Sequence, residues 1–327
     1  MRIAVTGSIA TDHLMTFPGS FTDQLLADRL DRVSLSFLAD RLEIRRGGVA
    51  ANISFGLGLL GLRPVLAGAV GGDFEPYRVW LKQHGVDTDS VLVSQEHHTA
   101  RFVCTTDRMQ NQIATFYAGA MTQARHIDLA DVIERVGRLG LVMVSPDDPE
   151  AMLRHTRTCR RLGIPFAADP SQQLARLDKD AVLDLVDGAR WLFTNEYEAA
   201  LLRERTGLTT AGVLRLVGTW VTTHGAAGVR IQSADGEVTA VPAVETAGVV
   251  DPTGVGDAFR AGFLAGMAWG VSRTCAAQLG CVVAATVLDY VGTQEYRLYR
   301  DSLVARIRGT YGAGCVAHLV THLRELT

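Results

Sequence analysis

The sequence predicts an α/β fold with a mostly parallel sheet and helices on both of its faces. From Leu141 onward, short apolar segments typical of buried strands alternate with longer runs of helical spacing. This alternation is typical of βαβ units, whose crossover helices cover a parallel sheet. Before residue 118, extended segments with two-residue alternation predict an additional small sheet. A glycine-rich turn at 251–257 leads directly into an apolar helix.

The first half of the chain is expected to begin with a buried strand that ends at Gly7 and Ser8. A hairpin is expected where two alternating segments flank the polar turn at 107–111. The other elements expected before residue 118 are strands at 33–38, 41–45 and 65–70, and helices from 47 to about 60 and from about 74 to 84, with the hairpin strands at 99–106 and 112–117.

The second half is expected to hold the alternating units, a second hairpin and three closing helices. Because no repeat, low-complexity tract or linker divides the chain, we expect a single domain over residues 1–327. The expected elements are strands at 141–144, 165–168, 191–194 and 220–223, a hairpin of 229–232 and 237–241, and helices at about 257–269, 273–290 and 301–325.

Composition limits the classes of partner and compartment. The net charge of −3 gives no reason to expect a nucleic acid or an anionic membrane as partner. The longest apolar stretch, 275–291, contains Gln278 and Asp289 and is too short and too polar for a membrane span. The first residues are typical of a strand and not of a signal peptide. Five scattered cysteines predict reduced thiols and a cytoplasmic location.

Lysine is rare, and this excludes two classes of phosphate-binding protein. The only lysines are Lys82 and Lys179, and neither follows a glycine-rich loop. A Walker-A site and a protein kinase both depend on a lysine in a fixed motif. Any phosphate bound by this chain must therefore be held by backbone amides, arginine and a metal ion.

The turn at 251–264 has the features of an anion site. Gly254 and Gly256 allow the backbone N–H groups to be exposed, and the helix start adds free donors and a positive dipole end. Asp257 would repel an anion there unless it had a task of its own. Taking the proton from a hydroxyl that attacks a phosphate is such a task. The alternative is an ordinary turn followed by an acidic first helical turn.

Two other motifs suit a polyhydroxylated ligand. Gly47 and Gly48 open a helix with Asn52 one turn in, so that the Gly48 amide and the Asn52 side chain could bond sugar hydroxyls. Asp12 follows the first strand and could accept bonds from two adjacent hydroxyls. A glycine linker, an ordinary helical Asn and a turn residue are the simpler interpretations.

Three further motifs follow predicted strands of the second half. Asn195 and Glu198 open a helix, and a carboxylate there suits Mg²⁺, which prefers hard oxygen ligands and retains waters. Residues 223–228 form a Thr-x-Gly-x-x-Gly turn. Residues 169–173 follow a strand at the sheet edge where open α/β sheets bind ligands. Acids in a first helical turn are commonplace, so the motif at Asn195 and Glu198 alone decides nothing.

Two apparent motifs are rejected. Residues 56–61 spell Gly-x-Gly-x-x-Gly, but they lie within a helical run and precede a strand, the reverse of a dinucleotide site. Cys315, His318 and His322 have metal-like spacing without a fourth ligand or a Cys pair, so zinc is not expected.

Together these motifs resemble those of the PfkB (ribokinase-like) family of sugar and nucleoside kinases. The turn at 251–257 is similar to the signature Asp-Thr-Thr-Gly-Ala-Gly-Asp, departing from it at Pro252 and Val255. The resemblance spans nearly the full length and implies a three-layer α/β/α fold. It also implies a small β-sheet lid built from about 9–17, 33–46 and 98–118. Sugar kinases often have Asp-x-Asn-x-Arg where this chain has 169–173, and this departure disfavours a sugar kinase.

Within that family the chain is similar to bacterial adenosine kinases, in the segments 3–15, 46–52 and 168–177. The resemblance implies transfer of the ATP γ-phosphate to the 5′-hydroxyl of adenosine, with Asp257 as base. It implies Mg²⁺ held through water by Glu198, activation by K⁺ and a homodimer formed through the lid. The alternatives are a ribokinase- or fructokinase-like sugar kinase and a non-catalytic nucleoside-binding regulator. The site residues implied are Gly254, Val255 and Gly256 around the phosphoryl group; Ser8, Asp12, Ser36, Gly48, Asn52, Phe102, Phe116, Gln172 and Gln173 around the nucleoside; and Asn195, Thr223, Gly225, Gly228 and Gly256 around ATP.

Overall fold

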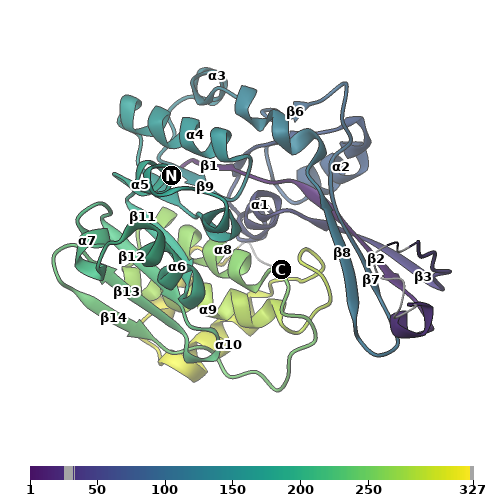
Figure 1. Ribbon diagram of the computed structural model, residues 1–327. Coiled ribbons are helices and arrows are strands. Elements are labelled where there is room, and N and C mark those ends of the chain that lie inside the picture. Colours follow the sequence, from purple (N-terminus) through teal and green to yellow (C-terminus); the bar gives the residue numbers. More distant parts are fainter. Residues whose placement is uncertain (26–31, 33, 325–327) are drawn as a thin grey trace.

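The computed structural model describes residues 1–25, 32 and 34–324 (Figure 1). Its centre is an eight-stranded sheet of order β14-β13-β12-β11-β10-β9-β1-β4. The strands from β12 to β4 run parallel, and β13 and β14 are antiparallel additions at one edge. Their bounds are β1 (Ile3–Thr6), β4 (Val65–Ala67), β9 (Leu141–Val144), β10 (Phe166–Ala168), β11 (Trp191–Asn195), β12 (Thr219–Thr223), β13 (Val229–Ser233) and β14 (Val238–Val241).

Helices cover both faces of this sheet. Successive side chains of its strands point to opposite faces and are buried on both, so each face forms an apolar core that helices must cover. Ile3 and Val5 of β1 belong to one core and Ala4 to the other. The first core receives α1 (Val49–Leu59), α2 (Glu75–Gln83), α8 (Val255–Ala268), α9 (Arg273–Val287), α10 (Arg300–Tyr311) and α11 (Val316–Leu319). The second receives α3 (Leu129–Val136), α4 (Pro149–Leu162), α5 (Lys179–Val186), α6 (Glu196–Thr206) and α7 (Thr210–Leu214). The expected three-layer architecture is confirmed.

A four-stranded sheet of order β3-β2-β7-β8 projects from the main body (Figure 1). Its strands are β2 (Ala10–Thr16), β3 (Arg41–Gly47), β7 (Ala100–Thr106) and β8 (Gln112–Tyr117). The pairing aligns Arg45, Asp12, Phe102 and Phe116 across the sheet, so these four side chains share one face. We call this set the Asp12 row.

The remaining elements are a two-stranded sheet and short 3₁₀ helices. The expected strand at 65–70 is interrupted at Gly68, and its last residues form β5 (Ala69–Val70), which pairs with β6 (Leu92–Val93). The 3₁₀ helices are η1 (Phe21–Gln24), η2 (Gly72–Phe74), η3 (Gly119–His126), η4 (Ser171–Ala175) and η5 (Gly225–Ala227).

Two sequence predictions of secondary structure are wrong. The segment 34–39 is not a strand, because Phe37 packs against the rings of Phe17 and Phe21 and does not join the sheet ladder. Val33, the first residue of that predicted strand, lies outside the described residues. The helix predicted over 301–325 ends at Tyr311, because Gly312 adopts a φ of 78°. Only the short α11 follows it, and residue 325 is not described.

The prediction of reduced thiols is wrong for one pair. Cys275 at the start of α9 and Cys315 between α10 and α11 form a disulfide, although 40 residues separate them in the sequence. His322 stacks on Trp269 with parallel rings. Among the described residues, no group of three or more His, Cys, Asp or Glu could hold a metal ion. In the same part of the chain, none of the helices has the length and apolarity needed to span a membrane.

Close packing between α8 and α9 fixes the position of the α8 N-terminus. A Cβ on Gly262 would lie 2.8 Å from the Cα of Gly280 and 3.0 Å from the Leu279 carbonyl oxygen. Residue 262 must therefore lack a side chain for the helix backbones to approach this closely. The glycine-rich turn at 251–257 is consequently held against a rigid helical pair.

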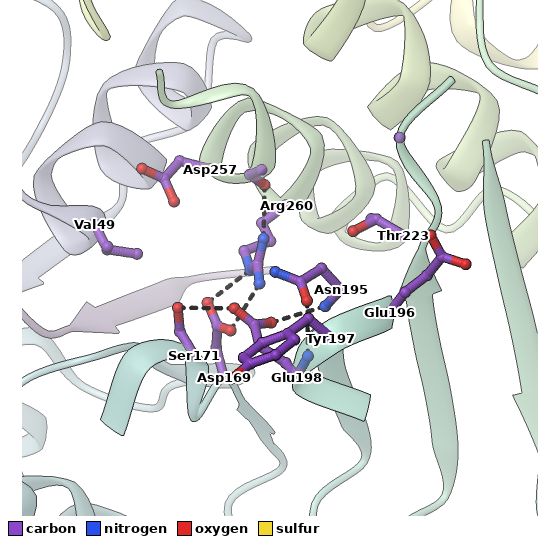
Figure 2. A pocket seen from close by; sticks show the side chains of 12 residues that line it. Val49, Asp169, Ser171, Asn195, Glu196, Tyr197, Glu198, Thr223, Asp257 and Arg260 are labelled. Carbon is purple, nitrogen blue, oxygen red and sulfur yellow. Dashed lines mark hydrogen bonds and ion pairs between the residues drawn. The ribbon is translucent and has the colours of Figure 1, made fainter. Parts of the chain in front are cut away.

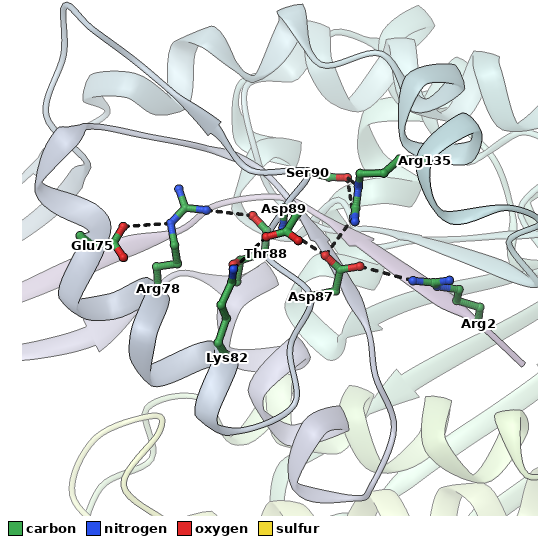
Figure 3. Close-up of polar contacts among 9 residues, drawn as sticks. All are labelled: Arg2, Glu75, Arg78, Lys82, Asp87, Thr88, Asp89, Ser90 and Arg135. Atoms are coloured by element: carbon green, nitrogen blue, oxygen red, sulfur yellow. Dashed lines mark hydrogen bonds and ion pairs between the residues drawn. The ribbon is translucent and has the colours of Figure 1, made fainter.

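A cluster of ion pairs joins segments on the side of the molecule shown in Figure 3. Asp87 accepts from Arg135 of α3 at 2.9 Å and from Arg2 at 3.3 Å, and Lys82 of α2 lies 2.9 Å from Asp89. Exposed pairs of this kind each contribute about 0–1 kcal/mol. We therefore interpret the cluster as a structural connection between the chain start, α2 and α3.

Candidate active site

Three adjoining cavities lie at the carboxyl edge of the central sheet. A cavity of about 460 Å³ lies beside the small sheet, a polar one of about 520 Å³ follows it, and an apolar one of about 620 Å³ comes last. Asp257 borders the first two, and Gly256 borders the second and third. The start of α8 therefore lies where all three cavities meet.

The α8 N-terminus has the geometry that the sequence predicts. Gly254 is the N-cap residue with a φ of 78°, and a Cβ there would lie 2.9 Å from Thr293. The first N–H groups of a helix have no carbonyl partner within that helix. The Val255 N–H donates to the Pro252 carbonyl at 3.4 Å. Those of Gly256 and Asp257 belong to the same first turn, which makes it a site for an anion.

Asp257 is buried, and its surroundings determine its acidity. Burial raises the pKa of Asp257 to about 6, and the Glu198 carboxylate contributes to the rise. The Arg260 guanidinium and a 2.8 Å hydrogen bond from Asn52 Nδ2 to Asp257 Oδ2 oppose it. A carboxylate that titrates near neutral pH is suited to act as a general base.

Asn52 is held in place by residues that the sequence prediction missed. Its Oδ1 accepts hydrogen bonds from Thr293 Oγ1 and Gln294 Nε2, both at 2.9 Å. Gln294 Nε2 also bonds the Tyr77 hydroxyl at 2.5 Å, and that hydroxyl donates to the Gly47 carbonyl at 2.9 Å. Thr293 and Gln294 follow α9 as a short polar segment, which is the only sequence signal that could have indicated them.

The first cavity collects most of the residues predicted for the nucleoside. Two exceptions are Ser36, which is exposed in the irregular segment at 34–39, and Phe102, which lies in the Asp12 row; neither is among the lining residues described. Those that do line it are Ser8, Asp12, Gly48, Asn52, Phe116, Gln172 and Gln173.

Three of these residues have defined polar environments. Burial raises the pKa of Asp12 to about 6, and the neighbouring Arg45 opposes the rise. Gln173 Nε2 donates to the Asp147 carbonyl at 2.7 Å, so its amide oxygen remains as an acceptor. Ser8 Oγ accepts from the Val49 amide at 3.0 Å, which helps to start α1.

Of the residues predicted for phosphate and metal, Asn195, Glu198 and Gly256 line the polar cavity (Figure 2). Gly254 lines the first cavity and Val255 the apolar one. Asn195 and Glu198 form a capping box: Glu198 N donates to Asn195 Oδ1 at 2.8 Å, and Asn195 N donates to Glu198 Oε2 at 2.7 Å. The box fixes the Glu198 carboxylate at the edge of the cavity. Ser171 Oγ also donates to Glu198 Oε1, at 3.2 Å.

Arg260 and Asp169 form a buried ion pair in this cavity that the sequence prediction did not assign. Nη2 of Arg260 lies 2.7 Å from Asp169 Oδ1, and Nε lies 2.6 Å from Oδ2. Arg260 is one turn beyond Asp257 on α8, a spacing that could have indicated its proximity.

The apolar cavity lies between β12, β13 and α9. Thr223, Gly225 and Gly256 line both this cavity and the polar one, while Gly228 and Val255 line only the apolar one. The residues predicted for ATP are therefore brought together around two connected spaces.

The comparisons with known proteins identify the family. The model of the pfkB family carbohydrate kinases matches residues 8–298. The chain belongs to the pfkB family of carbohydrate kinases. This confirms the resemblance to the PfkB family derived from the motifs.

Proteins similar to this pfkB-family chain include nucleoside kinases. A nucleoside kinase of Methanothermobacter thermautotrophicus is 30% identical over 290 residues, covering 87% of this chain and 92% of the relative. The structure of a Burkholderia thailandensis nucleoside kinase in complex with inosine has 32% identity and a TM-score of 0.82, covering 95% of this chain and 98% of the other. The same enzyme in complex with ADP-inosine has a TM-score of 0.80, with 33% identity and coverage of 95% and 96%. The ribokinase-like fold is confirmed.

Proposed function

We propose that this pfkB-family chain is an ATP-dependent nucleoside kinase that phosphorylates the 5′-hydroxyl of adenosine. The observation that carries the proposal is the position of Asp257 between two cavities. One cavity has the lining of a nucleoside site and the other that of a phosphate site. A base at the junction of the two cavities can take the proton from a substrate hydroxyl in the first cavity while that hydroxyl attacks a phosphate in the second.

The first cavity favours a nucleoside over a free sugar. Phe116 brings an aromatic ring to a space of about 460 Å³ that also holds the Asp12 carboxylate. The ring would pack against a base, and Asp12 would accept hydrogen bonds from ribose hydroxyls. Gln172 and Gln173 would bond the edge of the base. The similarity to nucleoside kinases, one of them bound to inosine, supports this class of substrate.

ATP would occupy the other two cavities. The glycines of the Thr-x-Gly-x-x-Gly turn leave room for a nucleotide between the polar and apolar spaces. The residues present fit Mg²⁺, because Mg²⁺ commonly uses one or two carboxylates together with water and substrate phosphates, and Glu198 borders the polar cavity. When bound, Mg²⁺ would offset the negative charge of the triphosphate.

In the proposed reaction the chain's own groups position the reactants and move one proton. Asp257 accepts the proton of the 5′-hydroxyl as that oxygen bonds to the γ-phosphorus. The bond from the γ-phosphorus to the β–γ bridging oxygen breaks, and ADP leaves with the electron pair. The amides from Gly254 to Asp257 hold the transferring phosphoryl group by hydrogen bonds.

A homodimer formed through the lid is part of the proposal. The face of the small sheet opposite to the Asp12 row exposes Leu42, Ile44, Ile113 and Tyr117. Exposed apolar side chains gathered on one face are typical of an interaction surface. Light scattering should show a dimer that Ile44→Glu disrupts. Activation by K⁺ and a cytoplasmic location remain predictions from the family resemblance and the composition.

An ADP-release assay with adenosine, inosine, guanosine, ribose and fructose tests the function. We expect the highest kcat/KM with adenosine. Inosine as the preferred substrate would keep the nucleoside-kinase class and change the assigned base. Preference for ribose or fructose would favour a sugar kinase, and nucleoside binding without ADP release would favour a non-catalytic regulator.

A further inference from the structure

Arg260 is a buried cation without an assigned role in phosphoryl transfer. It is 7% exposed, and its ion-pair partner Asp169, directly after β10, is 1% exposed. Figure 2 shows the two side chains joined by dashed lines. Removing two charges from water is costly, and well-packed apolar side chains often replace such a pair without loss of stability. Packing alone therefore does not explain this pair.

The guanidinium also holds the turn that carries the proposed base. Nη1 of Arg260 donates to the Gly256 carbonyl at 3.0 Å, while Nη2 and Nε contact Asp169. A Cβ on residue 256 would lie 2.9 Å from Nη1. A side chain at position 256 would therefore displace the guanidinium from this contact. The Phe193 ring, 5.7 Å from the guanidinium, limits its movement on another side.

Groups from several elements surround Asp257 and Arg260. The carboxylates are Asp169 after β10 and Glu198 of α6, and both interact electrostatically with Arg260. Asn52 of α1 donates a hydrogen bond to Asp257. The phenols of Tyr77 and Tyr296 also lie close enough to sense the charge of Asp257, and burial raises the pKa of each, so both stay neutral. Arg260 thus adds a positive charge to a site that contains three carboxylates.

We propose that Arg260, held by Asp169, is a positioning residue for phosphoryl transfer that fixes the first turn of α8 and keeps Asp257 ionised as the base. The inference rests on the proposed function and adds a role within that same site. Burial raises the pKa of Asp257, and the Arg260 charge is the largest effect that opposes the rise. Loss of that charge leaves more Asp257 protonated at a given pH. Arg260 therefore acts mainly on kcat.

The test compares the kcat–pH profiles of the full-length wild type and of Arg260→Gln, Arg260→Lys and Asp169→Asn. An opposite charge at close range shifts a carboxyl pKa by about 1–3 units. Arg260→Gln should therefore move the acid limb of kcat upward by about one pH unit or more. Arg260→Lys keeps the positive charge but cannot make all the contacts with Asp169 and Gly256. Its kcat should therefore be lower at every pH, while the acid limb of the kcat–pH profile stays at the wild-type pH. Asp169→Asn should also lower kcat, with the nucleoside KM nearly unchanged.

Arg160→Gln is the matched control. Arg160 forms an ion pair with Asp184 and donates hydrogen bonds to two backbone carbonyls, and it lines none of the three cavities. It should lower the melting temperature without moving the pH profile. A folded Arg260→Gln with wild-type kcat and acid limb overturns the proposal. If that variant does not fold, wild-type kcat in Arg260→Lys overturns it. If the wild type prefers a sugar, the proposed function fails, and the same profiles measured with that sugar still test Arg260.

Discussion

Asn52 Nδ2 donates a 2.8 Å hydrogen bond to Asp257 Oδ2, and this bond joins α1 to the first turn of α8. The two residues are 205 positions apart in the sequence. The sequence predicted Asn52 as a ligand of sugar hydroxyls. In the structure its amide also orients the proposed base, and Thr293 and Gln294 fix the amide. The Asn52 side chain thus both lines the first cavity and holds the carboxylate that is the proposed base.

The first prediction concerns Asp257→Asn. The amide keeps the volume of the side chain and the start of the helix but cannot accept a proton. A general base is worth ~10²–10⁴ in rate, so kcat should fall by that order. Adenosine binding, measured by calorimetry, should be largely retained. A folded variant with near-normal kcat would show that Asp257 is not the base.

The second prediction concerns pH. Since the pKa of Asp257 is raised to about 6, kcat should rise with pH through that value as the carboxylate forms. The bond from Asn52 favours the ionised form, so Asn52→Ala should raise the pKa and move the acid limb to higher pH. Steady-state kinetics would measure the acid limb of kcat for both proteins. The range from pH 5 to pH 8.5 extends about 1 pH unit or more to either side of the expected pKa of Asp257. An unmoved limb would contradict the assignment of this bond.

The third prediction concerns Mg²⁺. Since neither lysine lies in the site, the triphosphate charge must be offset largely by the metal. Activity should require Mg²⁺, and Glu198→Gln should raise the Mg²⁺ concentration at half-maximal rate. Glu196→Gln, two residues earlier on the same helix, is the comparison. Superimposable titrations of wild type and Glu198→Gln would remove Glu198 from the metal site.

The fourth prediction concerns the aromatic side chains of the Asp12 row. Stacking on a base is worth ~1–3 kcal/mol, so Phe116→Ala should raise the adenosine KM roughly 5- to 150-fold. Phe102→Ala, next to Phe116 in the row, should also weaken adenosine binding, and the KM for Mg-ATP should change little. Tyr299→Ala is the control, because Tyr299 is an exposed aromatic residue before α10 that lines none of the three cavities. Unchanged KM values for adenosine in both phenylalanine variants would favour a sugar kinase.

The fifth prediction concerns stability. Gly262→Ala would place a methyl group 2.8 Å from Gly280 and force α8 away from α9. Overpacking of this kind costs ~1–3 kcal/mol, so the melting temperature should fall. Gly309→Ala on α10 is the matched control, because its Cβ would meet no atom within 4 Å. It should instead stabilise the helix by ~0.5–1 kcal/mol. Equal melting temperatures for the two variants would contradict the close packing at Gly262.

The elements predicted from the sequence with most success were those with strong local patterns. The alternating segments of β7 and β8 and the buried strands from β9 to β12 form within one or two residues of their expected bounds. The glycine turn before α8 also forms as expected. The segment at 34–39 alternates as a strand would, yet its Phe37 is used in a local aromatic cluster. That preference depends on tertiary contacts and has no local signal.

Site residues that lie in a recognisable sequence motif were predictable. Site residues that act through contacts with distant parts of the chain were not. Glu198 and Asp257 lie in recognisable turns, and the fold brings both to one cavity. The partners Arg260 and Gln294 lie in helical or irregular sequence, and their roles come from contacts with residues 91 and 242 positions away. The disulfide of Cys275 likewise depends on how the last helices pack.

The strands of the small sheet come from two separate parts of the chain, β2 with β3 and β7 with β8. Between these parts the chain passes through α1, β4, β5, α2 and β6. The sheet therefore cannot be exchanged as a single cassette between related enzymes, as one continuous insertion could be. Grafting experiments would have to transplant two discontinuous segments together. Re-engineering of substrate choice is consequently more practical by single substitutions along the Asp12 row, at positions such as Phe102 and Phe116.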